Sequence, residues 1–182
     1  MNFRSIFIFV LVSTVLLSCK NDTKQSEPEV ITVEETSNKE PYKAADTKAE
    51  FNDPKVEEVY NRYIDLKTAL VNTNSSDAAA AAEQLMTAFA NVGVEEEALT
   101  AAQTMTEAGD DVEGQRVAFE TVTKHVETML QGALKSGTIY KQFCPMAFDN
   151  KGAYWLSNSN EIYNPYFGDV MLRCGRVDSE IK

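Results

Sequence analysis

The spacing of apolar residues between residues 53 and 134 constrains the fold more than any other feature of the chain. Apolar side chains recur there every three or four residues, which is the period of a helix with one buried face. The predicted helices run from Asp53-Pro54 to near Asn72, from a cap at Ser75, Ser76 or Asp77 to Gly93, from Glu95 to Gly109, and from Asp110 or Asp111 to about Leu134. Because only short connections join them, we expect neighbouring helices to pack antiparallel in a four-helix bundle.

The pattern changes after the last of these helices. Residues 138–143 alternate and are β-prone, and residues 153–156 follow the turn residues 149–152, so the pattern predicts a small hairpin or an extended loop. Asn164-Pro165 is typical of a helix start, and we expect a last short helix that ends at Gly175. The predicted class is therefore mainly α: an antiparallel four-helix bundle with a C-terminal β-hairpin-like segment and a short terminal helix packed on it.

The first residues carry the pattern of a secretory signal peptide. Arg4 precedes an apolar run, residues 6–17, that is shorter than the roughly 20 residues a transmembrane helix needs. Leu16-Leu17-Ser18-Cys19 resembles the lipobox of bacterial lipoproteins, in which the signal is removed before the cysteine and the cysteine receives lipid. We expect residues 1–18 to be a lipoprotein signal peptide and Cys19 to be the lipid attachment site. This places the chain at the cell envelope, on the periplasmic side or the cell surface, held to the membrane by lipid only.

The segment after the lipobox is polar and charged. It is rich in Lys, Glu, Asp, Thr and Ser, contains Pro28 and Pro41, and has no helical apolar period. Such a segment cannot bury enough apolar surface to offset its ordering entropy. We expect residues 19–51 to form a lipidated, disordered tether and residues 52–182 to form one helical domain.

Acidic side chains outnumber basic ones, with 28 Asp and Glu against 17 Lys and Arg in the whole chain. Proteins that bind nucleic acid neutralise phosphates with Lys and Arg, which an acidic chain does poorly. We therefore expect no nucleic-acid partner.

Two short motifs near the C-terminus each join a cysteine to a methionine. They are Cys144-Pro145-Met146 and Met171-Leu172-Arg173-Cys174, and on the predicted last helix Met171 and Cys174 would share a face. Thiolate and thioether sulfurs are soft donors that select Cu(I) among the common biological metals. If the hairpin brings the motifs together, the site for Cu(I) or Ag(I) consists of Cys144, Met146, Met171 and Cys174, with His125 as a candidate further ligand.

The same residues allow other roles. A disulfide between Cys144 and Cys174 is the usual state of two cysteines in an oxidising compartment, and it would close a loop of 30 residues worth roughly 3 to 4 kcal/mol. Methionine is also a common gap filler in helical cores.

The C-terminal part also contains several aromatic residues, which form either a docking surface or part of the core. These aromatic residues are Tyr154, Trp155, Tyr163, Tyr166 and Phe167. Catalysis is not expected, because His125 is the only imidazole available as a base.

The C-terminal motifs resemble a known family. Similarity to the bacterial domain of unknown function 3347 family rests on residues 144–157, 164–168 and 171–175, and it extends from about Val56 to Val177, including Gln115-Arg116 and Phe119. That family occurs as free lipoproteins and as the final domain of periplasmic adaptor subunits in copper and silver efflux pumps, and it has no assigned activity. The resemblance implies a periplasmic helical domain associated with heavy-metal handling, with the family's signatures on Cys144, Met146, Met171 and Cys174.

The chain has no room for an adaptor's own hairpin and barrel domains, so we expect a stand-alone protein. Its expected function is Cu(I) or Ag(I) buffering, delivery or efflux-associated resistance. The expected partner is a copper or silver efflux adaptor or another envelope metal-handling protein. The alternative function is that of a disulfide-pinned structural or protein-interaction module of an envelope complex without metal.

Overall fold

The computed structural model describes residues 40–182. The predicted signal peptide, the lipid attachment at Cys19 and the tether as far as residue 39 lie outside the described residues. The described part is mainly α, with about half of it helical and with two small antiparallel sheets, which confirms the mainly-α prediction. Among residues 40–182, no helix combines the length and the apolar character that a membrane crossing requires.

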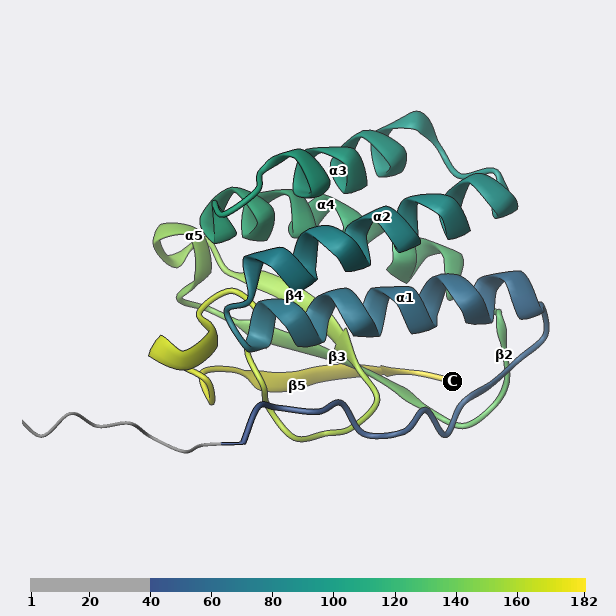
Figure 1. The fold of residues 1–182 in the computed structure, drawn as a ribbon. Coiled ribbons are helices and arrows are strands. Elements are labelled where there is room, and N and C mark those ends of the chain that lie inside the picture. The colour runs from purple at the N-terminus through teal and green to yellow at the C-terminus, as the bar shows by residue number, and fades with distance from the viewer. Residues whose placement is uncertain (1–39) are drawn as a thin grey trace, which may run out of the picture. The chain divides into compact units, whose positions relative to one another are not determined.

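Four long helices follow one another in the first part of the domain. They are α1 (Pro54–Val71), α2 (Ser75–Val92), α3 (Glu96–Glu107) and α4 (Val112–Met129). Each helix packs against the next one in the chain, and α4 also contacts α1 (Figure 1). All four predicted helices are therefore present, in the predicted order.

Side-chain caps fix where these helices begin. Asp53 and Asp111 cap α1 and α4 by accepting a hydrogen bond from an amide of the first turn, at 2.8 and 3.0 Å. Asn74 caps α2 in the same way, because its side-chain oxygen accepts from the Asp77 amide at 3.0 Å. The sequence-based prediction placed this cap at least one residue too late. Each cap satisfies an amide that has no partner within its own helix.

Helix α4 ends earlier than predicted, at Met129 rather than near Leu134. Turns follow it, and Gly132 there has a left-handed φ of +71°, which a continuing α-helix does not accommodate. Leu134 instead begins strand β2 (Leu134–Ser136).

The segment before α1 is part of the folded domain. Strand β1 (Glu50–Phe51) pairs antiparallel with β2, and Ala49 is buried. The prediction of a disordered tether up to residue 51 is therefore wrong for residues 40–51. The pairing supplies backbone partners and apolar burial that composition alone does not reveal.

The C-terminal sheet has the strand order β4-β3-β5, and both neighbours of β3 are antiparallel to it. Its strands are β3 (Ile139–Cys144), β4 (Ala153–Ser157) and β5 (Arg176–Ile181). The predicted hairpin is present as β3 and β4, joined through the short irregular turn α5 (Ala147–Asn150). The third strand, β5, was not predicted.

The predicted last helix over residues 164–175 is absent. A 3-10 turn, η1 (Gly168–Val170), forms there, and its first residue has a φ of +51° that interrupts any α-helix. The Asn164 side-chain oxygen accepts hydrogen bonds from the second and third amides after it, at 2.8 and 3.2 Å, which bends the chain into a loop. Met171 and Cys174 therefore do not share a helical face.

An aromatic core joins the helices to the sheet. Tyr63 of α1 and Phe119 of α4 stack with their ring centroids 5.2 Å apart, and Phe119 contacts Tyr166 at 5.7 Å. The Tyr63 hydroxyl also accepts a hydrogen bond from the Leu156 amide of β4 at 2.9 Å. Trp155 and Tyr166 are buried, so these two aromatic residues belong to the core and not to a docking surface.

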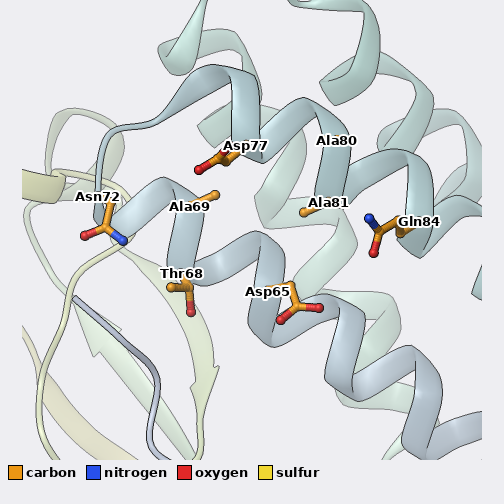
Figure 2. A pocket seen from close by; sticks show the side chains of 8 residues that line it. All are labelled: Asp65, Thr68, Ala69, Asn72, Asp77, Ala80, Ala81 and Gln84. Atoms are coloured by element: carbon orange, nitrogen blue, oxygen red, sulfur yellow. The ribbon is translucent and has the colours of Figure 1, made fainter. Parts of the chain in front are cut away.

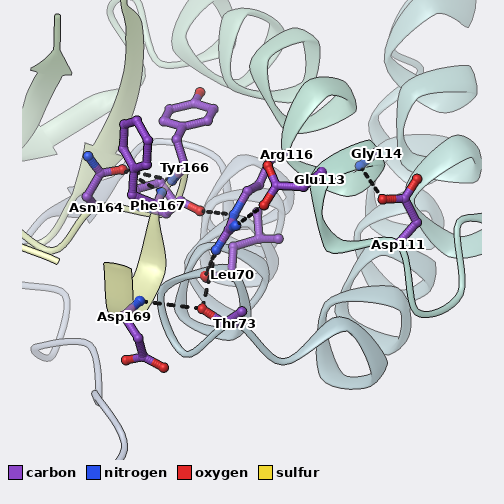
Figure 3. A network of polar contacts seen from close by, with 11 residues as sticks. Leu70, Thr73, Asp111, Glu113, Gly114, Arg116, Asn164, Tyr166, Phe167 and Asp169 are labelled. Carbon is purple, nitrogen blue, oxygen red and sulfur yellow. Dashed lines mark hydrogen bonds and ion pairs between the residues drawn. The ribbon is translucent and has the colours of Figure 1, made fainter. Parts of the chain in front are cut away.

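A buried arginine fastens the loop before β5 to the helices (Figure 3). Arg116 of α4 is 4% exposed, and its Nε donates to the Pro165 carbonyl at 3.0 Å. Its two terminal nitrogens donate to Thr73 Oγ1 at 3.3 Å and pair with the Glu113 carboxylate. Because a buried guanidinium without partners is costly, these contacts hold α4, the end of α1 and the loop together.

Gly168 lies where this loop passes the end of α1, and we expect Gly168→Ala to be strongly destabilising. An added Cβ would meet Thr73 Oγ1 and, at 2.7 Å, Arg116 Nη2, on a backbone with a φ of +51°. Backbone strain and overpacking together should lower the free energy of unfolding by about 2 to 4 kcal/mol, measured by urea denaturation. Gly132→Ala is the control, since its φ is +71° but nothing lies within 4 Å of an added Cβ. Equal losses in the two variants would contradict a role for the close contact.

Candidate functional site

The structure brings the two cysteines of the C-terminal part together. Cys144 is the last residue of β3, and Cys174 lies two residues before β5, which pairs with β3. Their Sγ atoms are in direct contact at 3.0 Å, a distance that exceeds the ~2.05 Å of a disulfide bond. Cys144 is fully buried, whereas Cys174 is partly exposed. The pair is thus reachable from solvent on the Cys174 side.

The proximity of the two thiols changes their acid–base chemistry. The hydrogen bond with Cys144, followed by burial and by the charge of Cys144, together raise the pKa of Cys174 to about 11. The Cys174 thiol is therefore protonated at neutral pH while it faces Cys144. A metal ion or an oxidant has to displace that proton before it can bond to the sulfur.

Hydrogen bonds from a buried asparagine hold Cys174 in place. The Asn164 side-chain nitrogen donates to the Cys174 carbonyl at 2.8 Å, and the Asn164 amide donates to the Leu172 carbonyl at 2.9 Å. Gly175 then passes so close to the core that an added Cβ would lie 2.7 Å from the Trp155 ring. The loop that carries Cys174 is thus fixed by side-chain and packing contacts and not by a helix.

The two methionines of the motifs both remain accessible. Met146 follows Cys144 at the start of α5 and is 47% exposed. Met171 directly follows η1 and is partly buried, and its carbonyl accepts a hydrogen bond from the Cys174 amide at 3.0 Å. Neither thioether belongs to the buried core, so neither is required to fill it.

The structure places His125 in different surroundings from the two thiols. Its Nε2 lies 3.3 Å from a Glu97 carboxylate oxygen, and Glu95 is close enough for all three to reach one point. In residues 40–182 this is the only group of at least three His, Cys, Asp or Glu side chains whose ligand atoms approach one another so closely. His125 therefore does not lie within ligand distance of both Cys144 and Cys174.

The open groove between α1 and α2 offers little chemistry (Figure 2). Its polar lining includes Asp65, Thr68, Asp77 and Gln84, and alanines form much of the rest. It contains no thiol, imidazole or amine. We do not assign a site to it.

Sequence reasoning missed one buried charged residue, Lys67. Its side chain is fully buried on α1, and its Nζ donates to the Tyr42 hydroxyl at 2.8 Å. Burial lowers the pKa of Lys67 to about 7. The available signal was its position four residues after Tyr63, on the apolar face of the predicted helix.

Comparison with known proteins gives one match. A family model described as a protein of unknown function (DUF3347) matches residues 59–137, which run from α1 to the end of β2. The match confirms the family resemblance for this helical part. Cys144, Met146, Met171 and Cys174 lie beyond the matched residues. No significant match to a curated protein or to a solved structure was found.

Removing Cys144 should make Cys174 more reactive. In Cys144→Ala the hydrogen bond that contributes most to the raised pKa of Cys174 is gone, so more thiolate is present at pH 8. We expect the alkylation rate of Cys174 to rise by about tenfold or more, measured by site-resolved mass spectrometry. Cys144→Ser keeps a hydrogen-bonding hydroxyl and should give a smaller rise. An unchanged or slower rate in the alanine variant would contradict the proposed coupling of the two thiols.

Proposed function

We propose that this chain, whose residues 59–137 belong to the DUF3347 family, is a lipid-anchored envelope protein that binds Cu(I) or Ag(I) through Cys144 and Cys174. The observation that carries the proposal is the 3.0 Å distance between the two Sγ atoms. Two thiols at that distance can bind one soft metal ion together. The proposed role is metal buffering, delivery or efflux-associated resistance, without catalysis.

The geometry requires only a small adjustment to admit a metal ion. If metal–sulfur bonds are about 2.3 Å long, as they are for zinc, two thiolates on one ion stand roughly 4 Å apart. The sulfurs, now 3.0 Å apart, would therefore separate by about 1 Å. Cys144 is held inside the sheet by its pairing with Ala153, so Cys174, on its partly exposed loop, is the residue that would move.

The methionines extend the proposed ligand set. Met146 and Met171 each lie within three residues of one cysteine, and both are at least partly exposed. Thioethers are soft ligands that add to thiolates at a Cu(I) site without adding charge. His125 is left out of this set, because its ring faces Glu97.

The rest of the proposal concerns placement and partners. We propose that the four long helices act as an antiparallel bundle that supports the sulfur-bearing sheet. The anchor at Cys19 and the envelope location rest on the sequence of the first residues and on the resemblance stated above. The proposed partner is a copper or silver efflux adaptor or another envelope metal-handling protein.

Anaerobic titration of the reduced chain with Cu(I), in competition with a chelator, tests the metal site. We expect one Cu(I) ion to bind with a dissociation constant below about 1 μM, because two thiolates and a thioether supply soft ligands. Cys144→Ser and Cys174→Ser should each weaken binding more than about 100-fold, and Met146→Leu or Met171→Leu should weaken it less.

Two control variants complete this titration. His125→Ala and Met129→Leu change an imidazole and a thioether outside the proposed ligand set, so neither should change the affinity. Binding weaker than micromolar, or binding that is unaffected by the loss of both thiols, contradicts the proposal.

The distance between the two Sγ atoms also favours a second candidate function, a structural or interaction module pinned by a disulfide. Sulfurs 3.0 Å apart need only a small approach to form an S–S bond once oxidised. Mass analysis of unreduced protein from its own cell envelope separates the two candidates. A complete Cys144–Cys174 bond that resists reductant favours the structural module, and free thiols or bound copper favour the metal site.

A further inference from the structure

The segment that precedes β1 is fastened across the domain by specific contacts. We call residues 40–49 the N-terminal strap. The Tyr42 amide donates to the Asn72 side-chain oxygen at 2.8 Å, and the Asn72 side-chain nitrogen donates back to the Tyr42 carbonyl at 2.9 Å. Further along, Asn158 donates to the Ala45 carbonyl at 2.8 Å. Figure 1 shows the strap as an extended segment that leads from the grey trace to α1.

Tyr42 also covers the buried amine of Lys67. The Tyr42 ring lies 4.7 Å from Lys67 Nζ, and the Tyr42 hydroxyl accepts its hydrogen bond at 2.8 Å. Lys67 is fully buried with the strap in place, and burial is also what lowers its pKa. An apolar-face lysine of this kind is unfavourable unless a partner satisfies it. The strap residue Tyr42 supplies that partner.

A stack of three side chains connects the strap to the loop that carries Cys174. The rings of Tyr42 and Tyr163 have their centroids 4.0 Å apart. The Arg173 guanidinium lies 3.9 Å from the centroid of the Tyr163 ring and donates to the Tyr163 hydroxyl at 2.9 Å. Arg173 directly precedes Cys174, so a continuous series of contacts runs from the strap to the residue before the partly exposed cysteine of the pair.

We propose that the N-terminal strap is a latch on the dithiol site: with Tyr42 docked, the stack holds Arg173 and keeps Cys174 against Cys144, and release of the strap frees Cys174. This inference concerns access to the site named under the proposed function. The latch itself does not require that the site bind copper. It couples the segment that leads toward the predicted tether to the accessibility of the more exposed thiol.

The latch is tested on the full chain, reduced and free of metal. Tyr42→Ala removes the ring stack and the partner of Lys67, so we expect the alkylation rate of Cys174 to rise about fivefold or more. Amide hydrogen exchange should become faster in the strap and in residues 159–175. Lys43→Ala is the matched control, because Lys43 is an exposed strap residue beside Tyr42, and it should change neither measurement.

Two further variants separate the contribution of the Tyr42 hydroxyl from that of the stacked side chains. Both keep the Tyr42 ring, so neither depends on its removal. Tyr42→Phe keeps the ring and loses only the hydroxyl that accepts from Lys67, so it should release the strap less than Tyr42→Ala. Arg173→Ala breaks the stack at its exposed end and should free Cys174 without freeing the strap. In the double variant with Tyr42→Ala, it should add little to the alkylation rate of Cys174, because both changes break the same stack of side chains.

Two results would overturn the latch. The first is fast amide hydrogen exchange in the strap of Tyr42→Ala while the alkylation rate of Cys174, in that variant and in Arg173→Ala, stays at the wild-type value. The other is a strap that remains protected in Tyr42→Ala. Since no metal is present, both results are independent of the copper titration, so failure of the latch and failure of the metal site are distinguishable.

Discussion

The central position of β3, with β4 on one side and β5 on the other, is the constraint on which the candidate site depends. The pairing of Cys144 with Ala153 fixes one thiol inside the sheet. The pairing of Phe143 with Arg176 returns the end of the chain beside it, so that the second thiol arrives within 3.0 Å. Two residues 30 positions apart in sequence meet because β5, which follows Cys174, pairs directly with β3, which ends at Cys144.

The sheet in turn depends on polar side chains that bind the loop before β5. Arg116 joins this loop to α1 and α4, and Asn164 shapes its start while holding the carbonyl of Cys174. Both side chains are buried, where an unsatisfied polar group costs more than a satisfied one contributes. The helical part that matches the family model and the sulfur-bearing part beyond it are therefore packed as one compact unit, linked by these bonds and by the aromatic core around Tyr63 and Phe119.

The two thiols differ in accessibility, because Cys144 is buried and Cys174 is partly exposed. Chemistry with an external thiol, metal ion or oxidant begins at Cys174, because Cys144 is not accessible. The raised pKa of Cys174 keeps this thiol protonated at rest, so its reactivity depends on separating the two sulfurs. The strap contacts through Tyr42 and Tyr163 end at Arg173, the residue before Cys174. A change in the strap therefore acts directly on the distance between the two sulfurs.

The sequence by itself determined the four helices, the β3–β4 hairpin and the residue types of the site, because helical spacing, caps and turn residues are local signals. Asp53 and the periodic apolar residues define α1 without reference to the rest of the chain. The sequence did not determine that Asn164 begins a loop and not a helix, since the loop is fixed by Arg116, which donates to the Pro165 carbonyl, and by the close approach of Gly168 to Thr73. It also did not place Tyr42 on Lys67, or β5 beside β3. Only the tertiary structure decided these, because each depends on a partner more than 20 residues away whose position is set by packing.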